Sequence, residues 1–418
     1  MGRKGRLLAV LAGLALLAVV SATAAFGARS ADPGITKTSI HIGGTFPLTG
    51  VASAYKTIPA AESAYYAYVN AHGGVNGRKI DFTVLDDAYN PAQTVPDVQQ
   101  LVEQDKVFAL VGDLGTAPGL ATWGYANEHK VPQVFLATGD SYWGNCVHKA
   151  CLGSAKPYTM GWQPDYIGEG RLYGKYIAAN TPNAKIGIIF QNDAFGRNYI
   201  AGLVQGLGSK KGDIVDQEGF NATDTVVTQQ ILALKAKGAD TLFIVATPGQ
   251  AIASLVTATK IGWKPTTFLA NVSNIRPFLL AAAQAGANLD GVISSSYLAP
   301  MDQANLAGIK LGKSIIDQYA PSLSADWALG DSNLDYGLGV AWTFVYALQQ
   351  AGKNPTRTSL MSALRNMSTS KNPFVYPGIT IQTSAKDGFP IEQLVLTKWS
   401  GGPTGLMHPF GKLVVAGH

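Results

Sequence analysis

The stretch IHIGGTFPLTG, residues 40–50, decides how the rest of the chain is interpreted. Apolar residues alternate in its first half before two glycines, which predicts a β-strand, and Pro47 and Gly50 bend the chain directly afterwards. In an open parallel sheet, ligands bind in the crevice outside the carboxyl ends of the strands. The loop around Pro47 is therefore a candidate for the mouth of a ligand-binding crevice.

The alternation of strand and helix continues through most of the chain. Apolar residues recur at helical spacing between consecutive short apolar runs, and this arrangement predicts parallel sheets with right-handed crossovers. The predicted strands after the first are residues 80–85, 107–111, 134–137, 186–190, 241–246, 267–269 and 290–296, with three more near Val215, near Ile379 and at 394–399. The fold class is α/β.

A chain of 418 residues is too long for one typical core, so two lobes are expected. Residues 158–164 and 297–300 have no clear period and are predicted to be crossings between the lobes. No low-complexity linker is present, which favours lobes joined by several short crossings that act as a hinge. The predicted division is residues 36–158 plus 298–372 for the first lobe and 161–296 plus 375–418 for the second.

The first 28 residues are predicted to be a secretory signal peptide. Residues 2–6 are basic, residues 7–20 are apolar, and small residues follow at 22–24. A membrane anchor is the alternative, but the apolar run is shorter than the roughly 20 residues that a span needs. We therefore expect an exported protein, periplasmic or extracellular, that is soluble after the signal is cleaved.

The two cysteines, Cys146 and Cys151, are predicted to form a disulfide, because disulfides persist in exported proteins. His148 lies between them and permits a metal site as the alternative. A structural metal site is usually closed by four ligands, so we predict no metal, and nothing in the sequence points to a cofactor.

The charge balance argues against a nucleic-acid partner. The formal net charge of +5 falls to +2 when Arg3, Lys4 and Arg6 leave with the signal, and no cluster of Lys and Arg follows. No G-x-S-x-G or G-x-G-x-x-G motif is present, and the histidines are scattered. The sequence thus predicts a protein that is not an enzyme and that binds a small molecule.

Polar loops of small residues follow several predicted strands. Such loops meet at the crevice of an α/β sheet, where backbone N–H groups at helix N-termini and side-chain hydroxyls can hold an anionic group. For any single loop, a Ser or Thr is more often a helix cap than a ligand contact. The loops are residues 45–55, 112–117, 137–141, 192–195, 247–249 and 271–273.

Four motifs resemble, in order and spacing, the branched-chain amino acid binding family, the leucine/isoleucine/valine-type periplasmic binding proteins of ABC importers. They are FPLTG at 46–50, HGGVNGRKI at 72–80, DDAYNP at 86–91 and NDAFG at 192–196, and the similarity extends from about Ser39 to Trp399. The resemblance implies the type I periplasmic binding protein fold, with two Rossmann-like lobes and a three-crossover hinge that closes on the ligand. It also implies a membrane permease as partner and a monomeric protein.

The resemblance also implies where the ligand binds. The loop after the third strand would hold a carboxylate, aromatic side chains would wall the cleft, and loops of the second lobe would contact the rest of the ligand. Residues at these positions are Gly115, Thr116, Ala117, Ala137 and Thr138 for the carboxylate, Tyr55 and Phe195 for the walls, and Thr247, Asn271 and Ser273 in the second lobe.

One departure from the family concerns the amine of an amino acid. Family members that bind amino acids present an acidic residue to the ammonium group, whereas the loop here reads Asn271-Val272-Ser273. An unpaired ammonium in a closed cleft is costly, so we expect that leucine is not the best ligand. Trp123, Tyr142 and Trp143 are expected near the cleft, where they could serve a larger ligand.

The predicted function is an extracytoplasmic solute-binding protein of an ABC importer. Its ligand would be a small carboxylate-bearing molecule, an amino acid or a related organic acid or amide. The alternative is a ligand-sensing receptor module of the same fold.

Overall fold

Two β-sheets organise the residues that this computed structural model describes, 32–144 and 156–416. All of the secondary structure lies within one contact unit that begins at Pro33. The predicted signal peptide and the predicted disulfide fall outside the described residues. Within the described ranges, no helix is both long and apolar enough to cross a bilayer.

The first sheet has five parallel strands in the order β2-β1-β3-β4-β5. β1 lies between β2 and the central strand β3, and it carries the stretch 40–46, whose Ile40, Ile42 and Phe46 are buried. We predicted an aperiodic crossing at 158–164, but three residues of that segment pair with β4 as an additional edge strand. The strands are β1 (Ser39–Phe46), β2 (Lys79–Asp86), β3 (Ala109–Val111), β4 (Gln133–Leu136) and β5 (Thr159–Gly161).

The second sheet has seven strands in the order β14-β13-β10-β9-β8-β6-β7. Strands β6 to β10 are parallel. β13 runs antiparallel to β10, and the short loop 401–405 returns the chain as β14, antiparallel to β13. The strand predicted near Ile379 is instead β12 (Ile381–Gln382), which pairs with β11 (Ser368–Thr369) in a separate two-stranded sheet. The other strands are β6 (Ile186–Gln191), β7 (Ile214–Phe220), β8 (Thr241–Val245), β9 (Thr266–Leu269), β10 (Ile293–Ser296), β13 (Gln393–Ser400) and β14 (Leu406–Val415).

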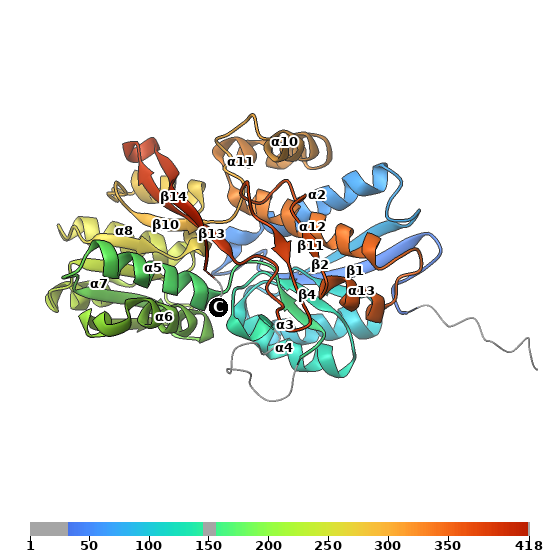
Figure 1. Cartoon of the computed structure of the whole chain (residues 1–418), viewed down its shortest axis with the longest axis horizontal. Coiled ribbons are helices and arrows are strands. Elements are labelled where there is room, and N and C mark those ends of the chain that lie inside the picture. The colour runs from blue at the N-terminus through green and yellow to red at the C-terminus, as the bar shows by residue number, and fades with distance from the viewer. Residues whose placement is uncertain (1–31, 145–155, 417–418) are drawn as a thin grey trace, which may run out of the picture. The chain divides into compact units, whose positions relative to one another are not determined.

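Helices cover both faces of each sheet, because each face is buried in its own apolar cluster. On the first sheet, α12 packs beside α2 although they are far apart in sequence (Figure 1). The helices are α2 (Thr57–Ala71), α3 (Pro91–Gln99), α4 (Thr116–Glu128), α5 (Tyr166–Asn180), α6 (Ala194–Leu207), α7 (Thr228–Ala236), α8 (Pro248–Lys260), α9 (Arg276–Gln284), α10 (Ala307–Tyr319), α11 (Ser324–Leu329), α12 (Ser332–Gln350) and α13 (Arg357–Leu364).

The polypeptide leaves the first sheet after β5, returns after β10 to helices that pack beside α2, and enters the second sheet again after β12. Phe389, beyond β12, packs against Leu136 and Trp143 of the first lobe. The lobe boundaries given above concern which residues move together, and they remain a prediction.

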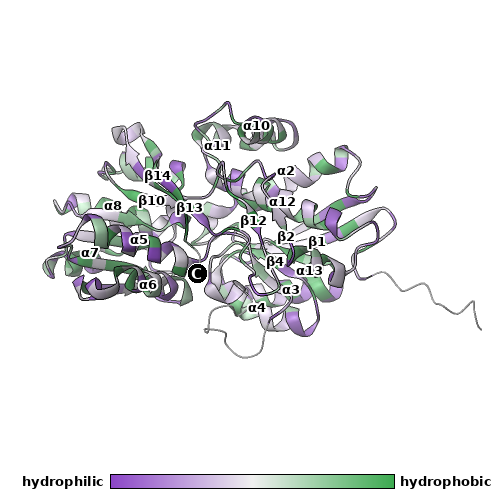
Figure 2. Cartoon of the chain, viewed as in Figure 1, coloured by the Kyte–Doolittle hydropathy of each residue, from purple (hydrophilic) through white to green (hydrophobic). Residues whose placement is uncertain are grey.

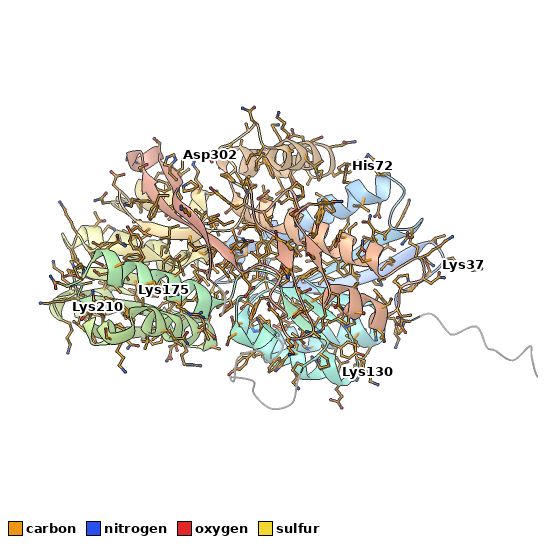
Figure 3. The ribbon with its side chains drawn as sticks, in the orientation of Figure 1. Lys37, His72, Lys130, Lys175, Lys210 and Asp302 are labelled. Atoms are coloured by element: carbon orange, nitrogen blue, oxygen red, sulfur yellow. The ribbon has the colours of Figure 1, made fainter. Side chains whose placement is uncertain are left out.

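The surface helices show the amphipathic pattern from which they were predicted. Along α5 and α6, hydrophobic and hydrophilic residues alternate around the helix, as expected when one face packs on a sheet (Figure 2). Charged side chains such as Lys37 and Lys130 are exposed and point outward (Figure 3).

Candidate ligand-binding site

A cavity of about 240 Å³ lies where the carboxyl ends of strands from both sheets meet. It continues from there toward α9, α11 and β14. Residues at the strand ends that line it are Tyr55, Tyr89, Leu114, Gly115, Thr116, Ala137, Gln163, Tyr166, Phe195, Thr247, Asn271 and Val272. Residues beyond them include Arg276, Leu279, Tyr297, Asp302, Trp327, Ala328, Tyr336, Trp399, Leu406 and Met407.

The N-terminus of α4 forms a polar part of the wall. Gly115 precedes the helix with φ of 111°, and no side chain caps it. The first N–H groups of a helix have no acceptor within the helix, and Pro118 has no N–H to offer. Gly115 and Thr116 line the cavity, so the backbone N–H of Thr116 lies at its edge, and Ala117 follows directly in the chain. This end of the cavity suits an anion.

The Thr116 hydroxyl is held by a neighbouring hydroxyl. Its Oγ1 lies 2.6 Å from Oγ1 of Thr138, and both residues are buried. One of these two oxygens must donate to the other, and the remaining hydroxyl hydrogen is available to a further acceptor. The pair therefore supports the anion site from behind.

A buried carboxylate fixes the loop that leads into α4. Asp113 Oδ1 accepts a hydrogen bond from the Thr45 N–H at 3.0 Å, and its Oδ2 accepts one from Gln133 Nε2 at 2.9 Å. These bonds tie the loop to β1 and β4. Burial raises the pKa of Asp113 to about 6, so the carboxylate is ionised at neutral pH.

The polar side chains of the second lobe are largely engaged within the protein. Asn271 donates from Nδ2 to the Ser295 carbonyl at 2.6 Å, and the Thr247 hydroxyl donates to Gln250 Oε1 at 2.7 Å. Ser273, which is buried, donates to the Ala246 carbonyl at 2.6 Å. These loops therefore present few spare donors to a ligand.

The buried carboxylate nearest to the Asn271 loop is Glu169, which does not line the cavity. Its Oε1 accepts from the Tyr173 hydroxyl at 2.7 Å and from the Asn271 N–H at 2.8 Å, and its Oε2 accepts from the Tyr199 hydroxyl at 2.7 Å. Burial raises the pKa of Glu169 above its ordinary value. The carboxylate supports the loop from beneath and is not presented to a ligand.

An aromatic wall completes the strand-end part of the cavity. Tyr166 stacks on Tyr199 with ring centroids 4.7 Å apart, and Phe195 meets Tyr166 edge to face at 5.2 Å. The Asp165 side chain caps α5 by accepting from the Ile167 N–H, which places Tyr166 at the start of the helix. Aromatic pairs of this geometry hold their rings in fixed orientations.

Direct hydrogen bonds between the lobes lie near the cavity, and two of them involve the side chains of Tyr55 and Asn198. The Tyr55 hydroxyl donates to the Val272 carbonyl at 3.0 Å. Asn198 Nδ2 donates to Asp140 Oδ2 at 2.9 Å. The two walls are thus linked through side chains as well as through the chain crossings.

Seven of the ten predicted site residues line the cavity: Tyr55, Gly115, Thr116, Ala137, Phe195, Thr247 and Asn271. Ala117, Thr138 and Ser273 lie outside its lining. Contact of all ten with a ligand remains a prediction. Trp123 and Trp143 do not line the cavity either, and they pack edge to face on each other at 5.5 Å.

Sequence reasoning missed several lining residues, among them Tyr89, Gln163, Tyr166, Tyr297 and Tyr336. Four of them carried a usable signal, because Tyr89 lies inside a family motif, Gln163 and Tyr297 lie in the predicted crossings, and Tyr166 comes two residues after the first crossing. Tyr336 lies on α12, where nothing in the helical pattern separates it from core residues.

Ionised side chains are scarce around the cavity. Of the described residues that line it, only Arg276 and Asp302 carry a charge. Asp302 is exposed and marks where the cavity reaches solvent, as its place on the outer surface in Figure 3 indicates. Within the described residues, no group of three or more His, Cys, Asp and Glu side chains could hold a metal ion.

Two α/β lobes with a cavity at their strand ends define a class of proteins that capture a solute. The chain matches the family model described as periplasmic binding protein over residues 39–403, and it belongs to that family. The predicted membership of the branched-chain amino acid binding group is confirmed, as is the prediction of a solute-binding protein that is not an enzyme. The family acts outside the cytoplasm, in agreement with the predicted export.

Curated relatives match at low identity. An amino acid binding protein of Pseudomonas aeruginosa is 25% identical over 178 residues, which are 42% of this chain and 45% of that protein, so the chain matches less than half of its length. A Leu/Ile/Val-binding protein homolog 8 of Brucella suis biovar 1 is 25% identical over 298 residues, 70% of each chain.

Solved structures confirm the fold. A branched chain amino acid ABC transporter protein from Thermus thermophilus with bound valine has a TM-score of 0.77 at 19% identity, covering 91% of this chain and 97% of its own. A fatty acid ABC transporter substrate-binding protein from Thermomonospora curvata has a TM-score of 0.75 at 22% identity, covering 92% and 95%. The predicted type I periplasmic binding protein fold is confirmed.

Proposed function

We propose that this protein is the solute-binding component of an ABC importer and captures a small carboxylate-bearing ligand in the cavity between its lobes. The observation that carries the proposal is the uncapped N-terminus of α4, which opens into that cavity with the Thr116 hydroxyl beside it. The similar proteins whose names mention valine and fatty acid are also binders of carboxylic acids, which supports the same class of ligand.

The mechanism is capture by hinge closure. The carboxylate accepts from the Thr116 and Ala117 N–H groups and from the Thr116 hydroxyl, while the remainder of the ligand contacts Phe195 and Asn271 in the second lobe. A ligand that touches both lobes binds the closed form more tightly than the open form, so it shifts the hinge toward closure. The closed monomer then docks on a membrane permease.

A thermal-shift screen tests capture directly. Amino acids, aromatic acids, straight-chain acids and amides are added to the purified protein, and a ligand at about 100 times its Kd should stabilise it by roughly 2.7 kcal/mol. A carboxylate that raises Tm supports the proposal. A screen in which no acid or amide raises Tm would refute it.

The transport role has its own test. The protein is added to proteoliposomes that contain a candidate ABC permease with its ATPase from the same organism, and ATP hydrolysis is measured with and without the ligand found in the screen. Stimulation by the liganded form supports import. Binding without stimulation would instead favour a sensing role.

A further inference from the structure

The cavity continues beyond the strand ends into a part that we call the outer limb, lined by Arg276, Leu279, Trp327, Ala328, Leu406 and Met407. These residues come from α9, α11 and β14. Leu279 and Trp327 are at most 7% exposed. In Figure 1, α11 and β14 lie along the upper edge of the view while α4 lies near the lower edge. The lining of the cavity thus includes residues at the N-terminus of α4, where the anion site lies, and residues of α9, α11 and β14.

The cavity is larger than the volume of a ligand with a small side chain. An apolar cavity of about 150 Å³ takes up benzene. The cavity here measures about 240 Å³, so it holds a ring-sized group and several further heavy atoms. Five of the six side chains that define the outer limb are apolar, which suits hydrocarbon. The polar Asn274 and Asn333 also line the cavity, and their amides donate to the carbonyls of Ser295 and Ala54.

Arg276, the cationic residue of the outer limb, is already hydrogen-bonded to carbonyl groups of the protein. Arg276 Nη1 donates to the Leu329 carbonyl at 2.9 Å, and weaker contacts reach the carbonyls of Gly405 and Thr404 at 3.4 and 3.5 Å. Its guanidinium thus ties the start of α9 to the end of α11 and to the loop before β14. The guanidinium therefore has hydrogen-bond partners without a second anionic group on the ligand.

At the strand ends, none of the described residues that line the cavity is an acid that could pair with an ammonium group. Among the described lining residues, Asp302 is the one acid, and it lies at the exposed end of the cavity. Both oxygens of Glu169, behind the Asn271 loop, already accept hydrogen bonds from within the protein. Burying an ammonium without a counter-charge is costly.

We propose that the ligand is an elongated monocarboxylic acid with an apolar tail and no α-ammonium group. Its carboxylate lies at the N-terminus of α4, and its tail passes the Tyr166 and Phe195 rings into the outer limb. This inference rests on the proposed function, since it presumes that a carboxylate binds at Thr116, and it narrows the class of ligand.

Calorimetric titration of the purified protein with matched ligands tests both parts. Removing the amine should tighten binding at least tenfold, comparing 3-phenylpropanoate with phenylalanine and 4-methylpentanoate with leucine. From butanoate to decanoate, affinity should rise about fourfold for each methylene that enters the cavity. Amino acids that bind as tightly as their amine-free partners, or no gain from longer tails, would overturn this inference and leave the proposed function standing. Failure of every acid to bind would overturn both.

A pair of variants on one helix locates the tail. Ala328 and Ala325 are both exposed residues of α11, but only Ala328 lines the cavity. Ala328→Trp should weaken decanoate at least tenfold and butanoate less than twofold, whereas Ala325→Trp should match the wild type for both. Retained butanoate binding shows that the variant is folded. Unchanged decanoate affinity in Ala328→Trp would overturn the placement of the tail.

Discussion

The two walls of the cavity differ in what they leave free for a ligand. On the first lobe, the N-terminus of α4 lacks a side-chain cap, and Thr116 lines the cavity beside it. On the second lobe, the side chains of Thr247 and Asn271 already donate to protein acceptors. Polar residues are thus present on both walls, but the Thr247 hydroxyl and the Asn271 amide of the second wall are already engaged within the protein, whereas Thr116 lies beside an uncapped helix start.

This difference separates two tasks that one binding site must perform. The first wall provides fixed donors for an anionic group, and such a group is common to many solutes. The second wall contributes rings and an internally bonded loop, so it discriminates by shape and by the cost of burying a charge. Changes to the first wall should therefore affect every ligand, and changes to the second should affect the choice among ligands.

Gly115→Ala should have the largest effect, because it disrupts the first wall itself. The residue has φ of 111°, and an added Cβ would lie 2.5 Å from the Tyr89 ring. We expect a loss of about 1–3 kcal/mol in the free energy of unfolding and at least a hundredfold loss of affinity for any carboxylate. Chemical denaturation and calorimetry measure the two effects.

Gly124→Ala on the same helix is the matched control. A Cβ at Gly124 meets nothing within 4 Å, so alanine should stabilise the helix by up to about 1 kcal/mol and leave affinity unchanged. Equal behaviour of the two variants would show that the conformation of Gly115 does not shape the site.

Thr116→Val compared with Thr247→Val tests the asymmetry of the walls most directly. Both substitutions remove a buried hydroxyl at nearly constant volume. A hydrogen bond to a charged group contributes about 1.5–3 kcal/mol, so Thr116→Val should weaken carboxylate binding about tenfold or more. Thr247→Val should change affinity less than twofold, because that hydroxyl donates to Gln250. If titration calorimetry gave the same loss of affinity for both variants, the proposed difference between the two walls would be wrong.

The bond between Asp140 and Asn198 links the walls and should depend on pH. Burial is the main cause that raises the pKa of Asp140 to about 7, with the nearby Asp165 and Asp193 adding to the rise and Arg197 opposing it. The folded state therefore binds a proton more tightly than the unfolded state, whose ordinary value is 3.8. The stabilisation that this tighter proton binding gives the folded state is fully present below about pH 4 and is lost as the pH rises through about 7.

Melting curves of the wild type and of Asp140→Asn between pH 4 and pH 8 check this dependence. The free energy of unfolding of the wild type minus that of the variant should fall by roughly 1–4 kcal/mol as the pH rises. A difference in stability that is constant across this range would mean that the carboxyl titrates as it does in the unfolded chain.

Ser273→Ala should have the smallest effect. The hydroxyl is buried and donates to the Ala246 carbonyl, so its loss should cost about 1 kcal/mol of stability. Affinity should change less than twofold, because Ser273 does not line the cavity. A tenfold loss in titration would place this side chain in contact with the ligand after all.

The sequence by itself determined the α/β fold and the edge of the sheet at which the cavity lies. Alternating apolar residues at 40–46 predict a strand because side chains of a strand point alternately to its two faces, and Pro47 marks where that strand ends. Since parallel strands share one edge for their carboxyl ends, the loops at Gly115, Ala137 and Asn271 could be placed together without coordinates.

Only the tertiary structure decided which polar and aromatic side chains face the cavity. Thr116 and Ser273 are similar hydroxyl residues in strand-end loops, yet Ser273 turns to a neighbouring carbonyl and Thr116 lines the cavity. Trp327 lines the outer limb, whereas Trp143 is packed in a core cluster. Hydrogen-bond partners and packing neighbours come from segments more than a hundred residues apart, as with Tyr55 and Val272, and local sequence patterns do not encode such pairs.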